Sequence, residues 1–397
     1  MLIPSIRDYD FSQKRVLVRV DFNLPLDSKG EILDSTRLIR SLPTLDRILE
    51  DEGSRILLIS HLGRPKGIDP KYSLEGVARR LEEIWKRRVS FCSSCIGTEA
   101  HQRSLDLPAK GVLLMENLRF HEDETKNESG FAKELARLGD VFVDDAFGNA
   151  HRKHASNVGI TKFFQDNLAG YLLEEEMKAI GHALKNSHAK KLALVGGAKV
   201  SDKILLLQRL LDRVDTLVLG GGMVYTFSYA TGGRVGSSLL ERESVGLVRD
   251  LLSHAQKTGK EIILPVDIVT AREIRENTDT FLRPLYDIPD GEYGLDIGEK
   301  SLSRFADHIR QARAVIWNGP MGMFEISPFS RGTRYMAELI KEITRRGRYS
   351  LVGGGDLIAA IGSILGKAGA THISTGGGAM LAFIEGKPMY GVEALRS

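Results

Sequence analysis

The chain has 397 residues, of which 42% are hydrophobic and 27% charged, a composition that excludes disordered, collagen-like and coiled-coil proteins. Its formal net charge is only +3, so bulk charge does not indicate a nucleic-acid-binding protein. It has neither an apolar run of about 18 residues nor the apolar core of a signal peptide near its start, so we expect a cytoplasmic protein without a membrane partner.

Short apolar runs alternate with amphipathic stretches along the chain. Strands are predicted over 16–22, 56–60, 112–116 and 141–144, and then over 192–195, 216–219, 262–265, 314–317, 349–352 and 372–374. Helices are predicted over 73–87, 128–138, 201–214, 241–258 and 330–346. Because the strand runs are apolar throughout, they fit parallel strands buried on both faces. Repeated strand–helix units indicate an α/β fold, and ten strands favour two sheets in two domains.

A long helical pattern over 171–187 has no predicted strand beside it and is the expected junction between the domains. One more crossover helix is the alternative interpretation of this segment. The domains are therefore predicted as 1–170, the interdomain helix 171–187, and 188–380. The tail 381–397 is expected to pack back on the N-terminal domain.

In parallel α/β sheets, ligands bind at the carboxyl ends of the strands. In the first half of the chain these ends carry arginines and histidines, and a further arginine lies just inside the helix after the first strand: Arg64, Arg119, Arg152, His61, His121, His151 and Arg37. Arginine's planar fork suits carboxylate and phosphate. Surface arginines paired with acids are the alternative, but their placement at corresponding strand ends predicts a site for a small, multiply charged anion.

Strand ends in the second half carry glycine runs instead, at 196–197, 220–222, 353–355 and 376–378. Glycine lets the backbone approach a ligand, and a following helix start offers N–H groups to anionic oxygens. A tight turn explains any single run, but four in one half predict a nucleotide phosphate site, although neither a P-loop nor a dinucleotide motif is present. Lys199 and Lys203 could reach phosphates, and Asp356 could hold Mg²⁺. An anion site and a nucleotide site on two lobes that face across a cleft fit phosphoryl transfer.

Ten segments resemble, in family order, the motifs of phosphoglycerate kinases: 19–25, 61–65, 116–120, 145–152, 196–203, 220–227, 264–270, 317–325, 353–356 and 374–379. The resemblance implies two Rossmann-like lobes, each a mainly parallel sheet flanked by helices, separated by a cleft and joined by a hinge helix. It also implies reversible phosphoryl transfer between ATP and the carboxylate of 3-phosphoglycerate, with Mg²⁺, in a hinge-bending cytoplasmic monomer. Another ATP-dependent carboxylate kinase on the same architecture, or an inactive binding protein that kept the fold, are the alternatives.

The resemblance assigns roles to particular residues. Substrate binding falls to Asp21, Phe22, Asn23, Arg37, His61, Leu62, Gly63, Arg64, Arg119 and Arg152. Nucleotide binding falls to Lys203, Gly221, Gly222, Gly294, Asn318, Glu325, Gly354, Gly355, Asp356 and Leu357, with Asp356 also the magnesium ligand. The catalytic residues would be Arg37, Lys199 and Lys203. Backbone donors at a helix start near the transferred group would come from Gly376, Gly377 and Gly378.

Two residues depart from the family pattern. Leu357 stands where Thr or Ser is usual, and Asn149 stands where Ala or Thr is more usual. Neither departure removes a charged residue, so the predicted activity stands. The two cysteines, Cys92 and Cys95, lack the second pair that a structural zinc site requires, so we interpret them as incidental thiols.

Overall fold

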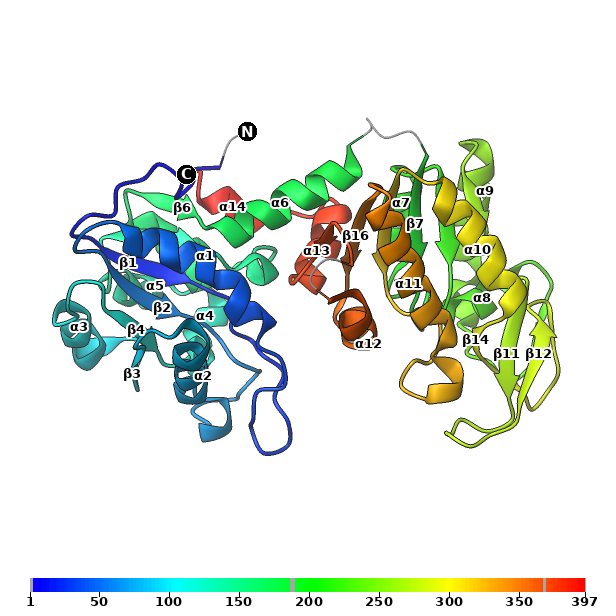
Figure 1. Cartoon of the computed structure of the whole chain (residues 1–397), viewed down its shortest axis with the longest axis horizontal. Coiled ribbons are helices and arrows are strands. Elements are labelled where there is room, and N and C mark those ends of the chain that lie inside the picture. The colour runs from blue at the N-terminus through cyan, green and yellow to red at the C-terminus, as the bar shows by residue number, and fades with distance from the viewer. Residues whose placement is uncertain (1–2, 186–189, 367–368, 397) are drawn as a thin grey trace. The chain divides into compact units, whose positions relative to one another are not determined.

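The computed structural model describes residues 3–185, 190–366 and 369–396. The chain divides into two compact units, an N-terminal unit of Met1–Lys178 with Lys387–Ser397 and a C-terminal unit of Ala179–Gly386. Among the described residues, each unit is built on one six-stranded parallel sheet with helices on both faces (Figure 1). The prediction of an α/β protein with two parallel sheets is therefore confirmed.

The sheet of the N-terminal unit has the strand order β3-β4-β2-β1-β5-β6, with every neighbouring pair parallel. Its strands are β1 (Arg15–Arg19), β2 (Arg55–Ile59), β3 (Ser90–Cys92), β4 (Val112–Met115), β5 (Val141–Asp144) and β6 (Asn167–Ala169). The short strands β3 and β6 were not predicted, because three residues at a sheet edge form no apolar run.

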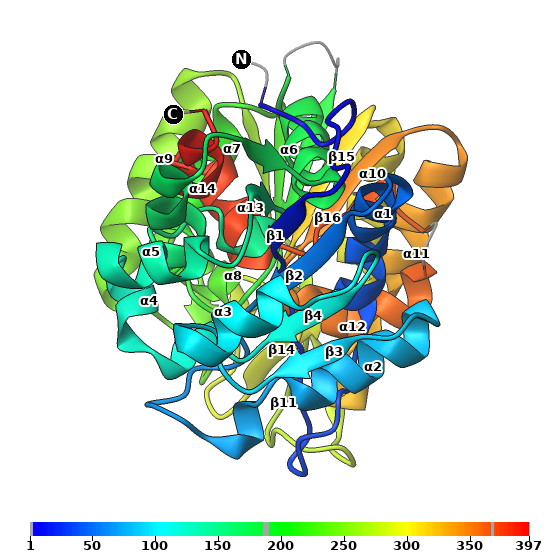
Figure 2. The same cartoon turned by 90° about the vertical axis from the view of Figure 1, so that its left-hand side faces the viewer.

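Helices cover both faces of this sheet. They are α1 (Thr36–Glu50), α2 (Glu75–Trp85), α3 (Gly97–Leu105), α4 (Glu122–Lys126), α5 (Ser129–Ala136) and α14 (Tyr390–Ala394). Short turns of 3₁₀ or π helix lie between them: η1 (Pro70–Tyr72), η2 (Leu118–Phe120), η3 (Phe147–Asn149), η4 (Ala155–Gly159) and η5 (Ile160–Phe163). Figure 2 shows α1 and α2 on one side of the sheet and α3, α4 and α5 on the other.

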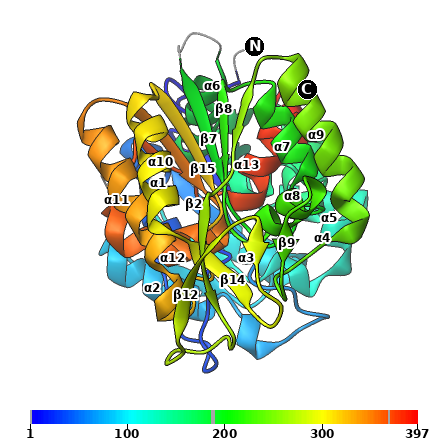
Figure 3. The same cartoon turned by 90° about the vertical axis from the view of Figure 1, so that its right-hand side faces the viewer.

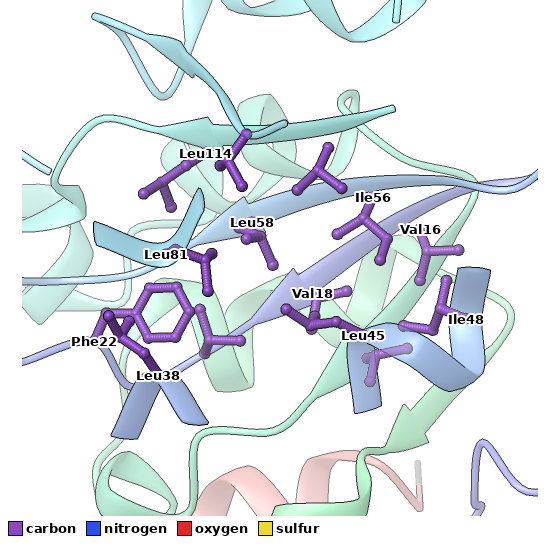
Figure 4. Close-up of a cluster of buried hydrophobic side chains, with 14 of the residues drawn as sticks. Val16, Val18, Phe22, Leu38, Leu45, Ile48, Ile56, Leu58, Leu81 and Leu114 are labelled. Atoms are coloured by element: carbon purple, nitrogen blue, oxygen red, sulfur yellow. The ribbon is translucent and has the colours of Figure 1, made fainter. Parts of the chain in front are cut away.

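Side chains that point alternately to the two faces of the sheet build the core of this unit. Val16 and Val18 of β1 pack with Ile56 and Leu58 of β2 against side chains of α1 and α2 (Figure 4). The intervening Leu17 is also fully buried, on the opposite face. Because both faces of the sheet are covered, an unbroken apolar run is what the fold requires of these strands.

The sheet of the C-terminal unit has the strand order β10-β8-β7-β15-β16-β17 and is also parallel. Its strands are β7 (Lys191–Val195), β8 (Thr216–Leu219), β10 (Glu261–Ile263), β15 (Ala314–Asn318), β16 (Tyr349–Gly353) and β17 (His372–Ile373). Its helices are α7 (Ile204–Leu211), α8 (Met223–Ala230), α9 (Val245–Lys257), α10 (Glu299–Gln311), α11 (Arg331–Arg345), α12 (Gly355–Leu365) and α13 (Gly377–Ile384). Figure 3 shows α10 and α11 on one face and α7, α9 and α13 on the other.

An antiparallel insertion in the C-terminal unit was not predicted. It consists of β11 (Asp267–Ala271), β12 (Thr280–Pro284) and β14 (Tyr293–Ile297), while β9 (Arg234–Val235) pairs with β13 (Asp287–Ile288) nearby. The 3₁₀ turns η6 (Arg242–Ser244) and η7 (Ser327–Phe329) also belong to this unit. In β12, exposed and half-buried residues alternate, so the strand lacks the apolar run by which strands were predicted.

The predicted interdomain helix corresponds to α6 (Tyr171–Leu184). The boundary between the two units lies within this helix, between Lys178 and Ala179. Positions 186–187 of that prediction, and 188–189 at the predicted start of the next domain, lie outside the described residues. The predicted helix 201–214 is shorter in the structure, because residues 201–203 form a turn before α7. In the described part of the chain, no helix is both long and apolar enough to cross a membrane.

Candidate functional site

The arginines predicted to converge leave neighbouring strands of the N-terminal sheet. Strands β4, β2, β1 and β5 are adjacent in that order, and Arg119, Arg64 and Arg152 follow the carboxyl ends of β4, β2 and β5. Arg37 lies in the first turn of α1, after β1. These four residues and Arg19, the last residue of β1, are called the arginine cluster below.

The loop after β2 is held by residues of two other strand ends. Asn23 accepts a hydrogen bond from the Gly63 N–H at 2.8 Å, and Arg119 donates to the Gly63 carbonyl at 2.5 Å. Gly63 has a φ of +64°, and a Cβ there would lie 2.4 Å from the Tyr72 ring, so only glycine fits. The structure thus brings three predicted substrate-binding residues into direct contact.

Arg37 forms an ion pair with Asp21, with 2.6 Å between Nη1 and Oδ2. The Arg37 side chain keeps 28% of its surface exposed, so it remains accessible to a ligand while the carboxylate orients it. The structure therefore joins the candidate catalytic arginine to a candidate substrate-binding residue.

Burial and the neighbouring positive charges together determine the protonation of His61 and His151. Burial, together with the charges of Arg19, Arg119, Arg152 and Arg37, holds the pKa of His61 well below its usual range. Burial and Arg152 lower the pKa of His151 to about 4, and burial with Arg152 and Arg19 lowers that of Arg119 to about 10. Both histidines are therefore neutral at pH 7, and an anion bound here would relieve repulsion among the arginines.

Sequence reasoning missed Arg19, which is only 1% exposed. Its Nε donates to Ser156 Oγ at 2.8 Å and its Nη2 lies 3.2 Å from His61 Nδ1. Ser156 Oγ in turn donates to the buried carboxylate of Glu124 at 2.6 Å, so a buried acid is linked to Arg19 through Ser156. An arginine inside an otherwise apolar strand was the available signal, since an arginine is almost never fully buried without a partner.

The side chains of Phe22 and Leu62 point into the core rather than toward a ligand. Figure 4 shows the Phe22 ring beside Leu38. Any contact of Phe22 or Leu62 with substrate is therefore made by the main chain.

Arg64 is exposed, whereas Asn149 is 3% exposed and its Nδ2 has no hydrogen-bond partner among the described residues.

In the C-terminal unit, the glycine runs follow β7, β8, β16 and β17. Two of the runs pack backbone to backbone, because the Met223 N–H donates to the Gly197 carbonyl at 3.2 Å. A Cβ on Gly221, whose φ is +70°, would lie 2.5 Å from that same carbonyl oxygen. Glycine at this position is therefore required by the close approach of two chain segments.

Lys203, Asn318 and Asp356 lie together at these strand ends. The Lys203 ammonium donates to Asn318 Oδ1 at 2.5 Å, and Asn318 Nδ2 donates to the Gly353 carbonyl at 2.8 Å. Burial lowers the pKa of Lys203 to about 8, and the negative charge of Asp356 opposes that shift. Asp356 occupies the first turn of α12, so one cation and one carboxylate flank a helix start.

The other predicted nucleotide residues have varied surroundings. Gly354 has a φ of +119°, and a Cβ there would meet Asn318 Nδ2 at 2.9 Å. Gly294 is buried against Tyr225, and its N–H already donates to Ser238 Oγ at 2.9 Å. Lys199 is exposed, Leu357 is fully buried, and Gly376 precedes the first residue of α13. Glu325 is exposed on the rim of a hollow of about 270 Å³.

Cys92 and Cys95 are both buried and not disulfide-bonded. Within the described ranges, no group of three or more His, Cys, Asp or Glu side chains could hold a metal ion. The cysteines therefore have no local partners for a zinc site in the part of the chain that is described.

Comparison with known proteins identifies the family of this chain. The phosphoglycerate kinase family model matches residues 6–387. A phosphoglycerate kinase from Chlorobium phaeobacteroides (strain BS1) is 47% identical over 390 residues, which are 98% of each chain. A cytosolic phosphoglycerate kinase from Triticum aestivum is 44% identical over 99% of this chain and 98% of its own. The solved phosphoglycerate kinase from Coxiella burnetii has a TM-score of 0.88 and 36% identity, and covers 100% of this chain and 99% of its own. From its fold, its strand-end residues and these similarities, the chain belongs to the phosphoglycerate kinase family.

Proposed function

We propose that the N-terminal unit binds 3-phosphoglycerate and the C-terminal unit binds ATP, for the family's reversible phosphoryl transfer that gives 1,3-bisphosphoglycerate and ADP. The observation that carries the proposal is the gathering of four arginines of the cluster around a neutral, buried His61, with the fifth, Arg64, close enough to Arg119 and Arg152 to lower their pKa values. Such a cluster matches a small substrate that carries both a phosphate and a carboxylate.

Within the N-terminal unit, we assign the substrate phosphate to Arg64, Arg119, Arg152 and His61. Arg119 is already fixed by the Gly63 carbonyl, and the neutral His61 can donate a hydrogen bond without adding to the charge. Asp21 and Asn23 would contact the hydroxyl and carboxylate end of the substrate. Asn23 accepts a hydrogen bond from the Gly63 N–H, so the loop before Arg64 is held next to the residues proposed to contact the carboxylate end.

Within the C-terminal unit, we assign the nucleotide phosphates to Lys203 and to the helix starts after the glycine runs. The exposed main chain at Gly355 and the adjacent Asp356 lie at the start of α12, where backbone N–H groups are free for anionic oxygens. Gly221, Gly222, Gly294, Asn318, Glu325 and Leu357 would shape the remainder of the nucleotide site.

Magnesium is the expected metal, and the donor set fits it. Mg²⁺ is usually held by one or two carboxylates, with phosphate oxygens and waters as the other ligands, and Asp356 supplies one such carboxylate beside Lys203. When bound, Mg²⁺ would neutralise charge on the nucleotide phosphates.

The transfer itself needs positioning and charge stabilisation more than proton transfer. The substrate carboxylate is ionised at pH 7, so it can attack without a general base. One of its oxygens forms a bond to the γ-phosphorus of ATP while the bond to the leaving oxygen of ADP breaks. Arg37, Lys199 and the N–H groups at the start of α13 would stabilise the charge spread over the transferring group.

We further propose that the chain acts as a monomer in the cytoplasm and that its units close on one another when both substrates are bound. Exclusion of water from the reacting groups is the physical reason for closure, since free water would accept the phosphoryl group. The word "cytosolic" in the names of the plant relatives supports the proposed location.

A coupled assay tests the proposed function. ATP, Mg²⁺ and 3-phosphoglycerate are mixed with the protein and ADP formation is followed, with reactions that omit Mg²⁺ or the acceptor as controls. We expect ADP formation only in the complete mixture. Faster turnover with a different carboxylate acceptor would instead support the alternative, another carboxylate kinase on this architecture.

A further inference from the structure

Glu241 is a buried acid that none of the assignments above uses. It lies just before η6, is 7% exposed, and its carboxylate faces the loop that carries Lys199. Oε2 accepts the N–H groups of Val200 at 2.5 Å and Ser201 at 3.1 Å, while Oε1 accepts the Ser201 hydroxyl at 2.5 Å. One carboxylate therefore fixes the two residues that directly follow Lys199.

The main chain of Glu241 is itself held by α8, the helix that follows the glycine run at 220–222. Its N–H donates to Thr226 Oγ1 at 3.2 Å, and Thr226 lies in α8, the helix that begins directly after Gly222. Glu241 thus links the loop after β7 to the helix after β8. These are the two segments whose glycines already pack backbone to backbone.

The charge of Glu241 also bears on this loop. Burial alone would raise its pKa, but the hydrogen bonds from Ser201 and Val200, with the charge of Lys199, lower it below its usual value. Glu241 is therefore ionised at neutral pH, and hydrogen bonds to a charged acceptor are shorter and stronger than neutral ones. Lys199 is exposed, whereas Val200 is fully buried. The position of Val200, which Glu241 fixes, therefore determines the position of the Lys199 main chain.

We propose that Glu241 is a positioning residue for phosphoryl transfer, which anchors Val200 and Ser201 so that Lys199 is held at the transferring phosphoryl group. This inference rests on the function proposed above, because it assumes that Lys199 acts on that group. Glu241 contributes by orientation, since a small displacement of a group that contacts the transferring phosphoryl lowers the rate steeply.

Asp267 provides a matched control in the same unit. It is 5% exposed, and its carboxylate accepts the N–H groups of Lys300 at 3.1 Å and Ser301 at 2.8 Å and the Ser301 hydroxyl at 2.5 Å. Its hydrogen bonds thus have the same pattern as those of Glu241, but they support the start of α10 rather than a glycine-run loop. The two acids therefore separate a loss of folding stability from a loss of loop geometry.

The test compares Glu241→Gln and Asp267→Asn by melting temperature, kcat, the KM values for ATP and 3-phosphoglycerate, and the dissociation constant of ADP with Mg²⁺. Both amides keep the size of the side chain. Each amide has one acceptor oxygen in place of two, however, and it carries no negative charge. For Glu241→Gln we expect kcat to fall about 10- to 100-fold, with the KM for 3-phosphoglycerate within about twofold of the wild type. For Asp267→Asn we expect a similar loss of melting temperature with kcat within about threefold.

A double-mutant cycle with Lys199→Met adds a readout that a purely structural role would not change. If Glu241 acts through Lys199, Glu241→Gln should reduce kcat by less than about threefold once the lysine is gone. Ser201→Ala removes one of the three hydrogen bonds and serves if Glu241→Gln does not fold. It should lower kcat about threefold in the wild type and have no effect in the Lys199→Met background.

Two outcomes overturn the inference while leaving the proposed function intact. One is an active wild type in which Glu241→Gln and Asp267→Asn reduce kcat equally. The other is a full effect of Glu241→Gln in the Lys199→Met background. An inactive wild type would instead overturn the proposed function itself.

Discussion

Arg37 is one of the side chains whose positive charge would stabilise the proposed transfer while negative charge is spread over the moving phosphoryl group. For Arg37→Ala we expect kcat to fall about 10²- to 10³-fold, as for the loss of other preorganised donors. The dissociation constant of ADP should change less than twofold, since Arg37 belongs to the N-terminal unit and the nucleotide residues belong to the other. Steady-state kinetics and calorimetry measure the two effects.

Arg40 offers the control for that variant. It lies one turn further along α1 and forms an ion pair with Glu175 at 3.3 Å. Arg40→Ala removes the same charge from the same helix, so kcat within about twofold of the wild type is expected. A kcat for Arg37→Ala that matched the Arg40→Ala value would place Arg37 outside the reacting groups.

Leu357 shows how a departure from the family pattern is accommodated. Its side chain is fully buried under the start of α12, next to Asp356. Leu357→Thr would place a hydroxyl in that apolar position and remove methyl groups, so we expect the free energy of unfolding to fall by about 1–3 kcal/mol. Phosphate binding at this helix start would use the backbone N–H, so ADP affinity should rise modestly at most.

Ile358 is the matched neighbour for the Leu357 experiment, because it is only half-buried. Ile358→Thr should lower the free energy of unfolding less than Leu357→Thr does. Weaker binding of ADP by Leu357→Thr would mean that the leucine itself contacts the nucleotide, contrary to this expectation.

At the scale of elements, the start of α6 depends on a buried acid at the end of β5. Asp145 Oδ1 accepts the N–H groups of Leu172 at 2.9 Å and Leu173 at 3.2 Å, which satisfies two donors at the helix start. Burial raises the pKa of Asp145 to about 8, above the usual value of about 3.9 for an unfolded chain. Its Oδ2 has no hydrogen-bond partner among the described residues, so ionisation of this carboxyl is poorly compensated.

This raised pKa predicts the sign of a pH dependence. Between about pH 4 and pH 8 the folded chain keeps a proton that the unfolded chain has lost, so this group makes the protein less stable as pH rises. Asp145→Asn keeps an oxygen for Leu172 and Leu173 but cannot ionise. Its free energy of unfolding should therefore rise relative to that of the wild type from pH 5 to pH 8, and the difference should level off above about pH 8. Urea melts at several pH values measure this, and parallel curves for the two proteins would contradict it.

The two glycine-rich helix starts illustrate a second rule at this scale. Gly221 and Gly354 both have positive φ and both lie where a Cβ would meet other chain atoms. Their sequence positions predicted a phosphate site, but their first physical role is to let segments of the unit approach one another closely. At the start of α8 this approach uses backbone N–H groups, since Gly221 donates to the Met321 carbonyl and Met223 donates to the Gly197 carbonyl.

At the scale of the whole molecule, the two proposed substrate sites belong to different units joined through α6. In-line transfer requires the reacting atoms to come within about 3–3.5 Å of one another. We therefore expect small-angle scattering to show compaction when both substrates are bound and little change with either alone. Equal compaction with a single ligand would show that closure does not depend on the pair.

The sequence by itself determined the two parallel sheets and most of the residues at their carboxyl ends. Short apolar runs such as that of β1 fit a strand covered on both faces, and their alternation with amphipathic stretches predicts α/β architecture without knowledge of partners. Arginines and glycines placed after such strands then fall at the same edge of a sheet. This is why the positions of Arg119, Arg152 and Asp356 at the sheet edges could be predicted from the chain alone.

Tertiary structure alone decided which of the predicted site side chains are buried and which distant residues hold the candidate site in place. Phe22 turns into the core, Arg19 is buried on Ser156, and Glu241 reaches back 40 residues to Ser201. The antiparallel strand β12, half-exposed on its insertion, left no apolar signal either. Periodicity in a sequence records how much of a segment is buried, whereas hydrogen bonds between distant segments depend on which elements become neighbours, and only the folded chain fixes that.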